Sequence, residues 1–276
     1  MSDVVSAEWL KANLGRVRTV DASWYMPEDG RNTAKEFEQG HIPGAVFFDI
    51  DAISDHATAL PHMLPSAAEF TGTAGALGIG NADMVVVYDT MGIFSSPRVW
   101  WTLRAFGHDR AAVLDGGLPA WKAKGGRLQT GPAAPEAANF APHLSSHLVK
   151  NFDQVKDGLG RTQILDARSA PRFEGREAEP RPGLKSGHMP GAVNIPWRSV
   201  LTADFRLKEA ADLRRLFAAK KIDLDRPIVT SCGSGISAAI LMLAAHELGG
   251  RNLALYDGSW AEWGGRDDAP VATGCR

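Results

Sequence analysis

Cysteine is scarce in this sequence, because the 276 residues contain only Cys232 and Cys275. Two thiols cannot build a disulfide framework or a four-cysteine zinc site. The composition therefore favours neither a disulfide-stapled secreted fold nor a structural metal. Cys275 lies next to the C-terminus, where we expect it to be exposed. A redox dimer through it is disfavoured, because the cytosol keeps exposed thiols reduced.

An excess of one charge and long apolar runs are also missing. Lys and Arg number 30 against 32 Asp and Glu, so the net charge is −2 and no basic surface for nucleic acid or anionic membranes is expected. The first twenty residues lack the apolar core of a secretory signal, and no apolar run is long enough to span a bilayer. We expect a cytoplasmic protein, by default a monomer, that binds neither nucleic acid nor membranes.

The sequence does contain an internal repeat, since four segments of the first half recur in the same order in the second half. The pairs are TVDASWYM from Thr19 with ILDARSAP from Ile164, GHIPGAVFFDID from Gly40 with GHMPGAVNIPW from Gly187, VVYDTMGIFSSPRVWW from Val86 with IVTSCGSGISAAILM from Ile228, and VLDGGLPAW from Val113 with LYDGSWAEW from Leu255. The offset stays between 142 and 147 residues. A period of this size indicates two copies of a whole domain rather than a solenoid.

Each copy alternates short apolar strands with helical stretches, which predicts an α/β fold with a mostly parallel sheet flanked by helices. In the second copy we expect strands near 163–167, 192–196, 227–232 and 252–257, and helices near 151–159, 208–220 and 237–249. Residues 129–142 are rich in Ala and Pro, which is typical of a linker. We predict an N-terminal domain over 1–128, a linker over 129–145 and a C-terminal domain over 146–276.

Cys232 stands where one of the buried strands ends. PIVTSC is mostly apolar, Gly-Ser-Gly follows, and SAAILMLAAHELGG predicts a helix directly after it. This joint would lie at the carboxyl edge of a parallel sheet, where open α/β folds bind ligands. The glycines let loop amides turn inward and the helix N-terminus adds partial positive charge, so the loop favours a thiolate. The alternative is a buried structural cysteine.

These residues are similar to those of a known family. CGSGISA resembles the C-G-[ST]-G-[VI]-[TS]-A loop of 3-mercaptopyruvate sulfurtransferases, and the repeated segments, with HMLP and SPRVWW, extend the resemblance over nearly the whole chain. The resemblance implies two tandem rhodanese-like domains, of which only the C-terminal one is catalytic. The sequence agrees, because Asp89 occupies in the first copy the place of Cys232 in the second.

The resemblance also implies a clamp for the substrate. The family pattern G-R-F-x-G-x-x-x-x-x-R is met by Arg172 and Arg181, although Pro171 replaces its glycine. The two arginines would hold the carboxylate and ketone of 3-mercaptopyruvate. The loop amides would stabilise the anionic sulfur, and the loop residues are Gly233, Ser234, Gly235, Ile236 and Ser237.

On the residues alone, the arginine-rich segment has a simpler interpretation. Glutamates 174, 177 and 179 lie among the arginines, as in a solvated loop of ion pairs. We assign Arg168 and Arg176 to surface or salt-bridge roles of this kind.

In the first copy, Asp51 and His62 match positions that are proposed in the family to form a proton relay with the loop serine, here Ser234. Such a relay would handle the protons of the substrate thiol and of the departing enolate. The alternative is that Asp51 caps a turn and His62 is a surface loop residue.

The resemblance predicts an enzyme that moves sulfur from 3-mercaptopyruvate through a Cys232 persulfide to thioredoxin, a small thiol or cyanide, with release of pyruvate and with no cofactor or metal. A thiosulfate sulfurtransferase is the nearest alternative, but Gly233 and Ser234 replace the two cations that suit that dianion. A non-enzymatic persulfide carrier is another. A phosphatase is rejected, because Ala238 stands where its phosphate-binding arginine would be.

Overall fold

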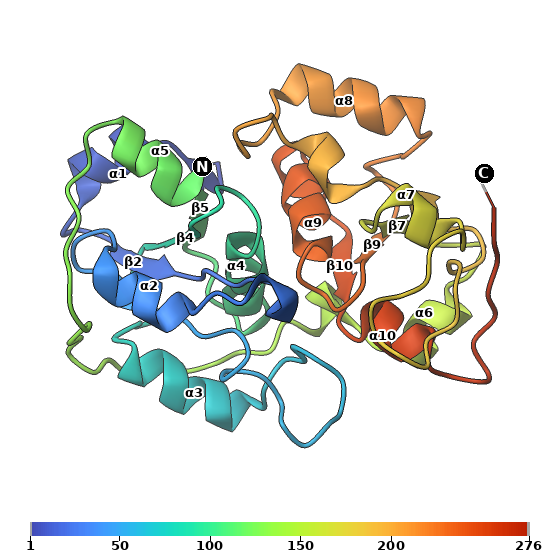
Figure 1. Cartoon of the computed structure of the whole chain (residues 1–276), viewed down its shortest axis with the longest axis horizontal. Coiled ribbons are helices and arrows are strands. Elements are labelled where there is room, and N and C mark those ends of the chain that lie inside the picture. The colour runs from blue at the N-terminus through green and yellow to red at the C-terminus, as the bar shows by residue number, and fades with distance from the viewer. Residues whose placement is uncertain (1, 275–276) are drawn as a thin grey trace. The chain divides into compact units, whose positions relative to one another are not determined.

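The structure is a computed structural model that describes residues 2–274. Two compact units make up the described chain. The first unit comprises the chain up to Asp55, Leu64–Ser145 and Ala203–Leu207, and the second comprises His56–Met63, Ser146–Thr202 and the chain from Lys208 on. Each unit holds one five-stranded sheet in which all the paired strands are parallel. The predicted α/β fold with two flanked parallel sheets is confirmed (Figure 1).

The sheet of the first unit has the strand order β1-β5-β4-β2-β3. Its strands are β1 Val4–Val5, β2 Arg18–Asp21, β3 Val46–Phe47, β4 Val85–Tyr88 and β5 Ala111–Leu114, and its helices are α1 Ala7–Asn13, η1 Pro27–Asp29, α2 Thr33–Gln39, α3 Ala67–Ala76, α4 Ser96–Ala105 and α5 Gly117–Ala123. Strand β4 reads VVVY and is buried throughout, as expected for a central strand covered on both faces. Helices α1, α2 and α5 cover one face with Leu10, Phe37 and Trp121.

The sheet of the second unit repeats this order as β6-β10-β9-β7-β8. Its strands are β6 Val149–Lys150, β7 Gln163–Asp166, β8 Val193–Asn194, β9 Ile228–Ser231 and β10 Leu253–Tyr256, and its helices are η2 Ser146–Leu148, α6 Phe152–Asp157, α7 Ala170–Phe173, η3 Trp197–Val200, α8 Ala210–Ala219, α9 Ala238–Glu247 and α10 Ser259–Trp263. The four strands and three helices predicted here are confirmed, each within a few residues. The short helices α7 and α10 were not predicted.

The repeat extends to single side chains. Nδ1 of His41 lies 2.7 Å from the carbonyl oxygen of Phe37, and the two rings stack at 3.9 Å. In the second unit, Nδ1 of His188 lies 2.8 Å from the carbonyl oxygen of Phe173, with the rings at 3.8 Å. Each histidine therefore packs against a phenylalanine of its own unit in the same way, which is a structural role.

The predicted linker follows the surface of the first unit. None of residues 129–145, all of which the structure describes, lies in a helix or strand. Phe140 is buried and meets Phe70 edge-on at 5.4 Å, and the amide of Ala138 donates to the carbonyl of Gly75 at 3.0 Å. Segments His56–Met63 and Ala203–Leu207 each belong to the unit that does not surround them in sequence. The predicted domain boundaries did not include this placement of the two segments. The boundaries themselves stay predictions.

Within residues 2–274, no helix has both the length and the apolar character required to cross a membrane.

Candidate active site

Cys232 directly follows the central strand β9, and helix α9 begins six residues later. The residue is only 2% exposed. The loop is anchored by the first turn of α10: the Trp260 amide donates to the carbonyl of Cys232 at 3.0 Å, and the Cys232 amide donates to Oγ of Ser259 at 3.2 Å. A third bond, from the Ala261 amide to the carbonyl of Gly233, is 2.8 Å long. Both the amide and the carbonyl of the cysteine are therefore hydrogen-bonded to residues of α10.

The loop aims one of its amides at the sulfur. The N–H of Gly235 donates to Sγ of Cys232 across 3.1 Å. Gly235 has φ +84°, a conformation that side chains with a Cβ rarely adopt, so glycine suits this turn. Ile236 is buried, and Ser237 directly precedes α9. An amide directed at the sulfur stabilises negative charge there, whether on a thiolate or on a persulfide.

Arg172, on α7, lies against this loop. A Cβ built on Gly233 would be 3.1 Å from Nη2 of Arg172, so the missing side chain leaves room for the guanidinium. Glu179 orients the guanidinium through Nε to Oε1 at 3.2 Å and Nη2 to Oε2 at 2.5 Å. The structure thus brings the first predicted clamp residue next to the cysteine loop.

Glu179 also pairs with Arg168, and this pair lies inside the second unit. Nη1 of Arg168 is 2.8 Å from Oε1 of Glu179, and Nη2 is 2.6 Å from Oδ2 of Asp166. The guanidinium stacks over the ring of Trp260 at 4.1 Å. Burial lowers the pKa of Arg168, but the carboxylates of Asp166 and Glu179 outweigh it and raise that pKa above its usual value.

These contacts correct the sequence interpretation of Arg168. The salt-bridge assignment is confirmed, but a surface position is wrong, because the side chain is only 1% exposed. Glu179 was assigned to a solvated loop, yet its side chain is 2% exposed. Arg176 fits the surface assignment, since it is exposed and pairs with Glu174. No sequence signal marked Glu179, because only long-range packing decides which acid of a mixed-charge loop is buried.

Arg181, the second predicted clamp residue, is half-buried. It makes no hydrogen bond or ion pair with any residue between 2 and 274. Its guanidinium is therefore available to a ligand, but no contact ties it to the cysteine loop.

The predicted relay residues divide between the units. Ser234 is 8% exposed, within the cysteine loop. His62 is buried, has φ +61°, and belongs to the second unit through segment His56–Met63. Asp51 belongs to the first unit, is exposed, and accepts a hydrogen bond from Nε1 of Trp24 at 3.0 Å. The relay stays a prediction.

The equivalent loop of the first unit shows what such a cradle can hold. The carboxylate of Asp89 is fully buried after β4 and accepts the amide protons of five residues and the hydroxyl proton of Ser96 at 2.6 Å. The five amides lie 2.9 to 3.1 Å away and belong to Met91, Gly92, Phe94, Ser95 and Ser96. Burial raises the pKa of Asp89, and the hydrogen bonds from Ser96 oppose this rise. This loop is an anion nest filled by its own side chain.

Among residues 2–274, no group of three or more His, Cys, Asp and Glu side chains is arranged to hold a metal ion. His143 and His147, which stand four residues apart in the sequence, belong to no such group. Cys275 lies outside the described residues.

Known proteins resemble this chain in both sequence and structure. The Rhodanese family, described as Rhodanese-like domain, matches residues 6–124 and 151–266. The 3-mercaptopyruvate sulfurtransferase of Rattus norvegicus is 44% identical over 94% of this chain and 91% of its own length. The thiosulfate sulfurtransferase of Gallus gallus is 42% identical over 94% and 92%. The crystal structure of the 3-mercaptopyruvate sulfotransferase SseA from Escherichia coli superposes with a TM-score of 0.86 at 37% identity, over 94% of this chain and 99% of its own.

Proposed function

This chain belongs to the rhodanese-like sulfurtransferases, and from that premise we propose that it transfers the sulfur of 3-mercaptopyruvate to a thiol acceptor through a persulfide on Cys232. One observation carries the proposal: a buried cysteine ends the central strand, accepts an amide proton at its sulfur, and has the guanidinium of Arg172 beside its loop. A nucleophile, an anion-stabilising donor and a carboxylate-binding cation thus meet at one sheet edge.

The first half-reaction charges the enzyme. The Cys232 thiolate attacks the substrate sulfur, so an S–S bond forms and the substrate C–S bond breaks. The electron pair of the broken bond becomes the enolate of pyruvate. The proton from the substrate thiol is transferred to the enolate carbon, and the products are a Cys232 persulfide anion and pyruvate. The amide of Gly235 is positioned to stabilise the negative sulfur at each stage.

In the second half-reaction the outer sulfur of the Cys232 persulfide is passed to an acceptor. An acceptor thiolate attacks the outer sulfur of the persulfide, takes it as its own persulfide, and leaves Cys232 as a thiolate. Thioredoxin or a small thiol can act as this acceptor, and cyanide in an assay attacks the same sulfur and leaves as thiocyanate. Because each substrate reacts in turn with the same sulfur, the kinetics are ping-pong, and neither cofactor nor metal takes part.

Arg172 and Arg181 hold the substrate carboxylate and ketone in this proposal. The fixed position of Arg172 against the cysteine loop and the unpaired guanidinium of Arg181 within residues 2–274 support these roles. Arginine suits the task because its planar fork matches a carboxylate.

Ser234, His62 and Asp51 move the proton between the substrate thiol and the enolate. In support, Ser234 lies two residues from Cys232, and His62 is a buried member of the same unit. The contact of Asp51 with Trp24 lies in the other unit, so its part rests on the resemblance alone. We place the enzyme in the cytoplasm as a monomer, on the basis of its sequence.

A thiosulfate sulfurtransferase is the second candidate, because the similar Gallus gallus protein bears that name. Gly233 and Ser234 provide no side-chain cation to the loop, and this composition favours a mercapto acid over an inorganic dianion.

The decisive experiment follows pyruvate release from 3-mercaptopyruvate with a thiol acceptor, in wild type and in Cys232→Ser. We expect the variant to lose at least about a thousandfold in kcat/KM, since the serine hydroxyl is a far weaker nucleophile than a thiolate. Parallel measurements with thiosulfate separate the two candidates. Equal pyruvate release by the two proteins would refute the proposal, and a kcat/KM for thiosulfate well above that for 3-mercaptopyruvate would favour the second candidate. A persulfide on Cys232 without pyruvate release would indicate a carrier.

A further inference from the structure

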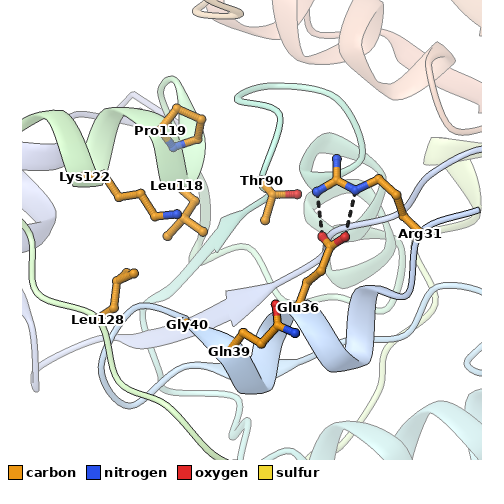
Figure 2. Close-up of a pocket in the computed structure, with 9 residues that line it drawn as sticks. All are labelled: Arg31, Glu36, Gln39, Gly40, Thr90, Leu118, Pro119, Lys122 and Leu128. Atoms are coloured by element: carbon orange, nitrogen blue, oxygen red, sulfur yellow. Dashed lines mark hydrogen bonds and ion pairs between the residues drawn. The ribbon is translucent and has the colours of Figure 1, made fainter. Parts of the chain in front are cut away.

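The first unit contains a cavity of about 530 Å³ on the side where Asp89 ends its strand. Its walls come from helices α2 and α5 and from four residues outside them, which are Arg31, Gly40, Thr90 and Leu128. Thr90 directly follows Asp89. Figure 2 shows Lys122 reaching from α5 toward the middle of this space, opposite the ion pair of Arg31 and Glu36. We call it the first-unit pocket. Its volume lies within the usual range of small-molecule sites, roughly 300 to 1,000 Å³.

The repeat explains why the first unit has space here. The amide of Leu118 donates to the carbonyl of Asp89 at 2.9 Å, just as the amide of Trp260 donates to that of Cys232. Leu118 is therefore the counterpart of Trp260 in the repeat. The ring of Trp260 is fully buried and stacks against the guanidinium of Arg168. A leucine fills much less volume than an indole with a guanidinium stacked on it.

Two other differences distinguish the first unit from the second near this pocket. Ser23 stands where the second unit has Arg168, since each amide donates to the carboxylate of an aspartate two residues earlier, at 2.9 Å. The stacked Phe37 and His41 are four residues apart, whereas Phe173 and His188 are fifteen apart. The extra residues of the second unit include Glu179, so its buried carboxylate has no counterpart in the first unit.

The lining favours an anion. Arg31 and Glu36 neutralise one another through contacts of 2.8 and 2.7 Å. Lys122 is exposed and has no hydrogen bond or ion pair with any residue between 2 and 274, and the same holds for the side-chain amide of Gln39. The walls therefore carry one uncompensated positive charge and an uncommitted amide donor.

The remaining wall is apolar. It is formed by Leu118, Pro119 and Leu128, and Leu128 is 41% exposed, although leucine is usually buried. A ligand that satisfies this lining combines a negative group with an apolar body. We propose that the first-unit pocket binds a small organic carboxylate, with its charge at Lys122 and Gln39 and its apolar body against Leu118 and Leu128.

The test is a titration of the full-length protein with benzoate, followed by amide NMR. We expect saturable shifts at Gly40 and Thr90, which line the pocket. Benzamide, the neutral isostere, should bind at least about tenfold more weakly, because the ion pair with Lys122 is lost. Resonances of Gly233 and Gly235 report separately on the catalytic loop, so the outcome is independent of the proposed function.

A pair of charge-matched variants locates the site. Lys122→Glu should weaken the shifts at Gly40 and Thr90 by at least about tenfold in affinity. Lys35→Glu makes the same charge change on exposed α2, outside the lining, and should leave the affinity as in wild type. The proposal is overturned by any of three results: no saturation below about 10 mM, equal binding of benzoate and benzamide, or unchanged binding in Lys122→Glu.

Discussion

At the scale of single residues, one carboxylate organises the arginines of the second unit. Glu179 accepts from Arg168 through one oxygen and from Arg172 through both. Arg168 is also fixed by Asp166 and by the ring of Trp260, whose amide bonds to Cys232. The position of Arg172 beside the cysteine loop therefore depends on a residue that lies outside that loop.

Glu179→Ala should destabilise the protein by roughly 3 kcal/mol, because it leaves the buried Arg168 with one carboxylate fewer and releases Arg172. Urea unfolding followed by tryptophan fluorescence measures the loss. Glu177→Ala is the matched control: it lies in the same loop, is exposed, and should change the free energy of unfolding by less than about 0.5 kcal/mol. Equal effects of the two substitutions would show that the Glu179 network contributes nothing to stability.

At the scale of elements, two equivalent loops, one in each unit, join a central strand to the next helix, and their amides donate to different groups. After β9 the loop presents an amide to a thiol, and after β4 it folds five amides around the carboxylate of Asp89. The first unit thus holds its own carboxylate at the position where the second unit presents a thiol. Its loop is a structural cap, which explains why α4 begins there without a capping serine bond.

Asp89→Ala should lower the free energy of unfolding by about 3 kcal/mol. The substitution removes a buried carboxylate, but it leaves five loop amides without their acceptor, and the second effect is larger. Chemical denaturation measures the change. Asp109→Ala removes a carboxylate that is 80% exposed and should have almost no effect. A loss below about 1 kcal/mol in Asp89→Ala would mean that water replaces the carboxylate at little cost.

The elements also show where sequence reasoning succeeds. The apolar run before Cys232 and the glycines after it predicted the strand, the loop and the helix, because these signals are local. The contact of Arg172 with the loop followed from a motif. The burial of Glu179, the nest around Asp89 and the exchange of segments 56–63 and 203–207 depend on packing between residues far apart in the chain, which no local pattern encodes. The relay of Asp51, His62 and Ser234 and the domain boundaries remain predictions.

At the scale of the whole molecule, the two copies contain equivalent buried aspartates, but only one of these has an arginine as its neighbour. Asp166 ends β7 and is paired with the guanidinium of Arg168. Asp21 ends β2 in the same way, but its neighbour is Ser23, which supplies only an amide at 2.9 Å and a hydroxyl at 2.5 Å. Burial raises the pKa of Asp21 from 3.8 to about 6, although the bonds from Ser23 oppose it. The first unit therefore carries a pH-dependent weakness at this position.

This weakness predicts a pH-dependent difference between wild type and Asp21→Asn. Because the pKa of Asp21 is higher in the folded state, its stabilising contribution is complete below about pH 4 and is lost as the pH rises through about 6. A rise from 3.8 to about 6 corresponds to about 3 kcal/mol. The side-chain amide of the variant would keep an acceptor for Ser23 but carry no charge. As the pH rises from about 4 to about 7.5, the unfolding free energy of the variant should therefore increase by about 3 kcal/mol relative to that of wild type. Urea titrations across this range, with Asp109→Asn as the exposed control, measure the difference, and a difference independent of pH would contradict the burial argument.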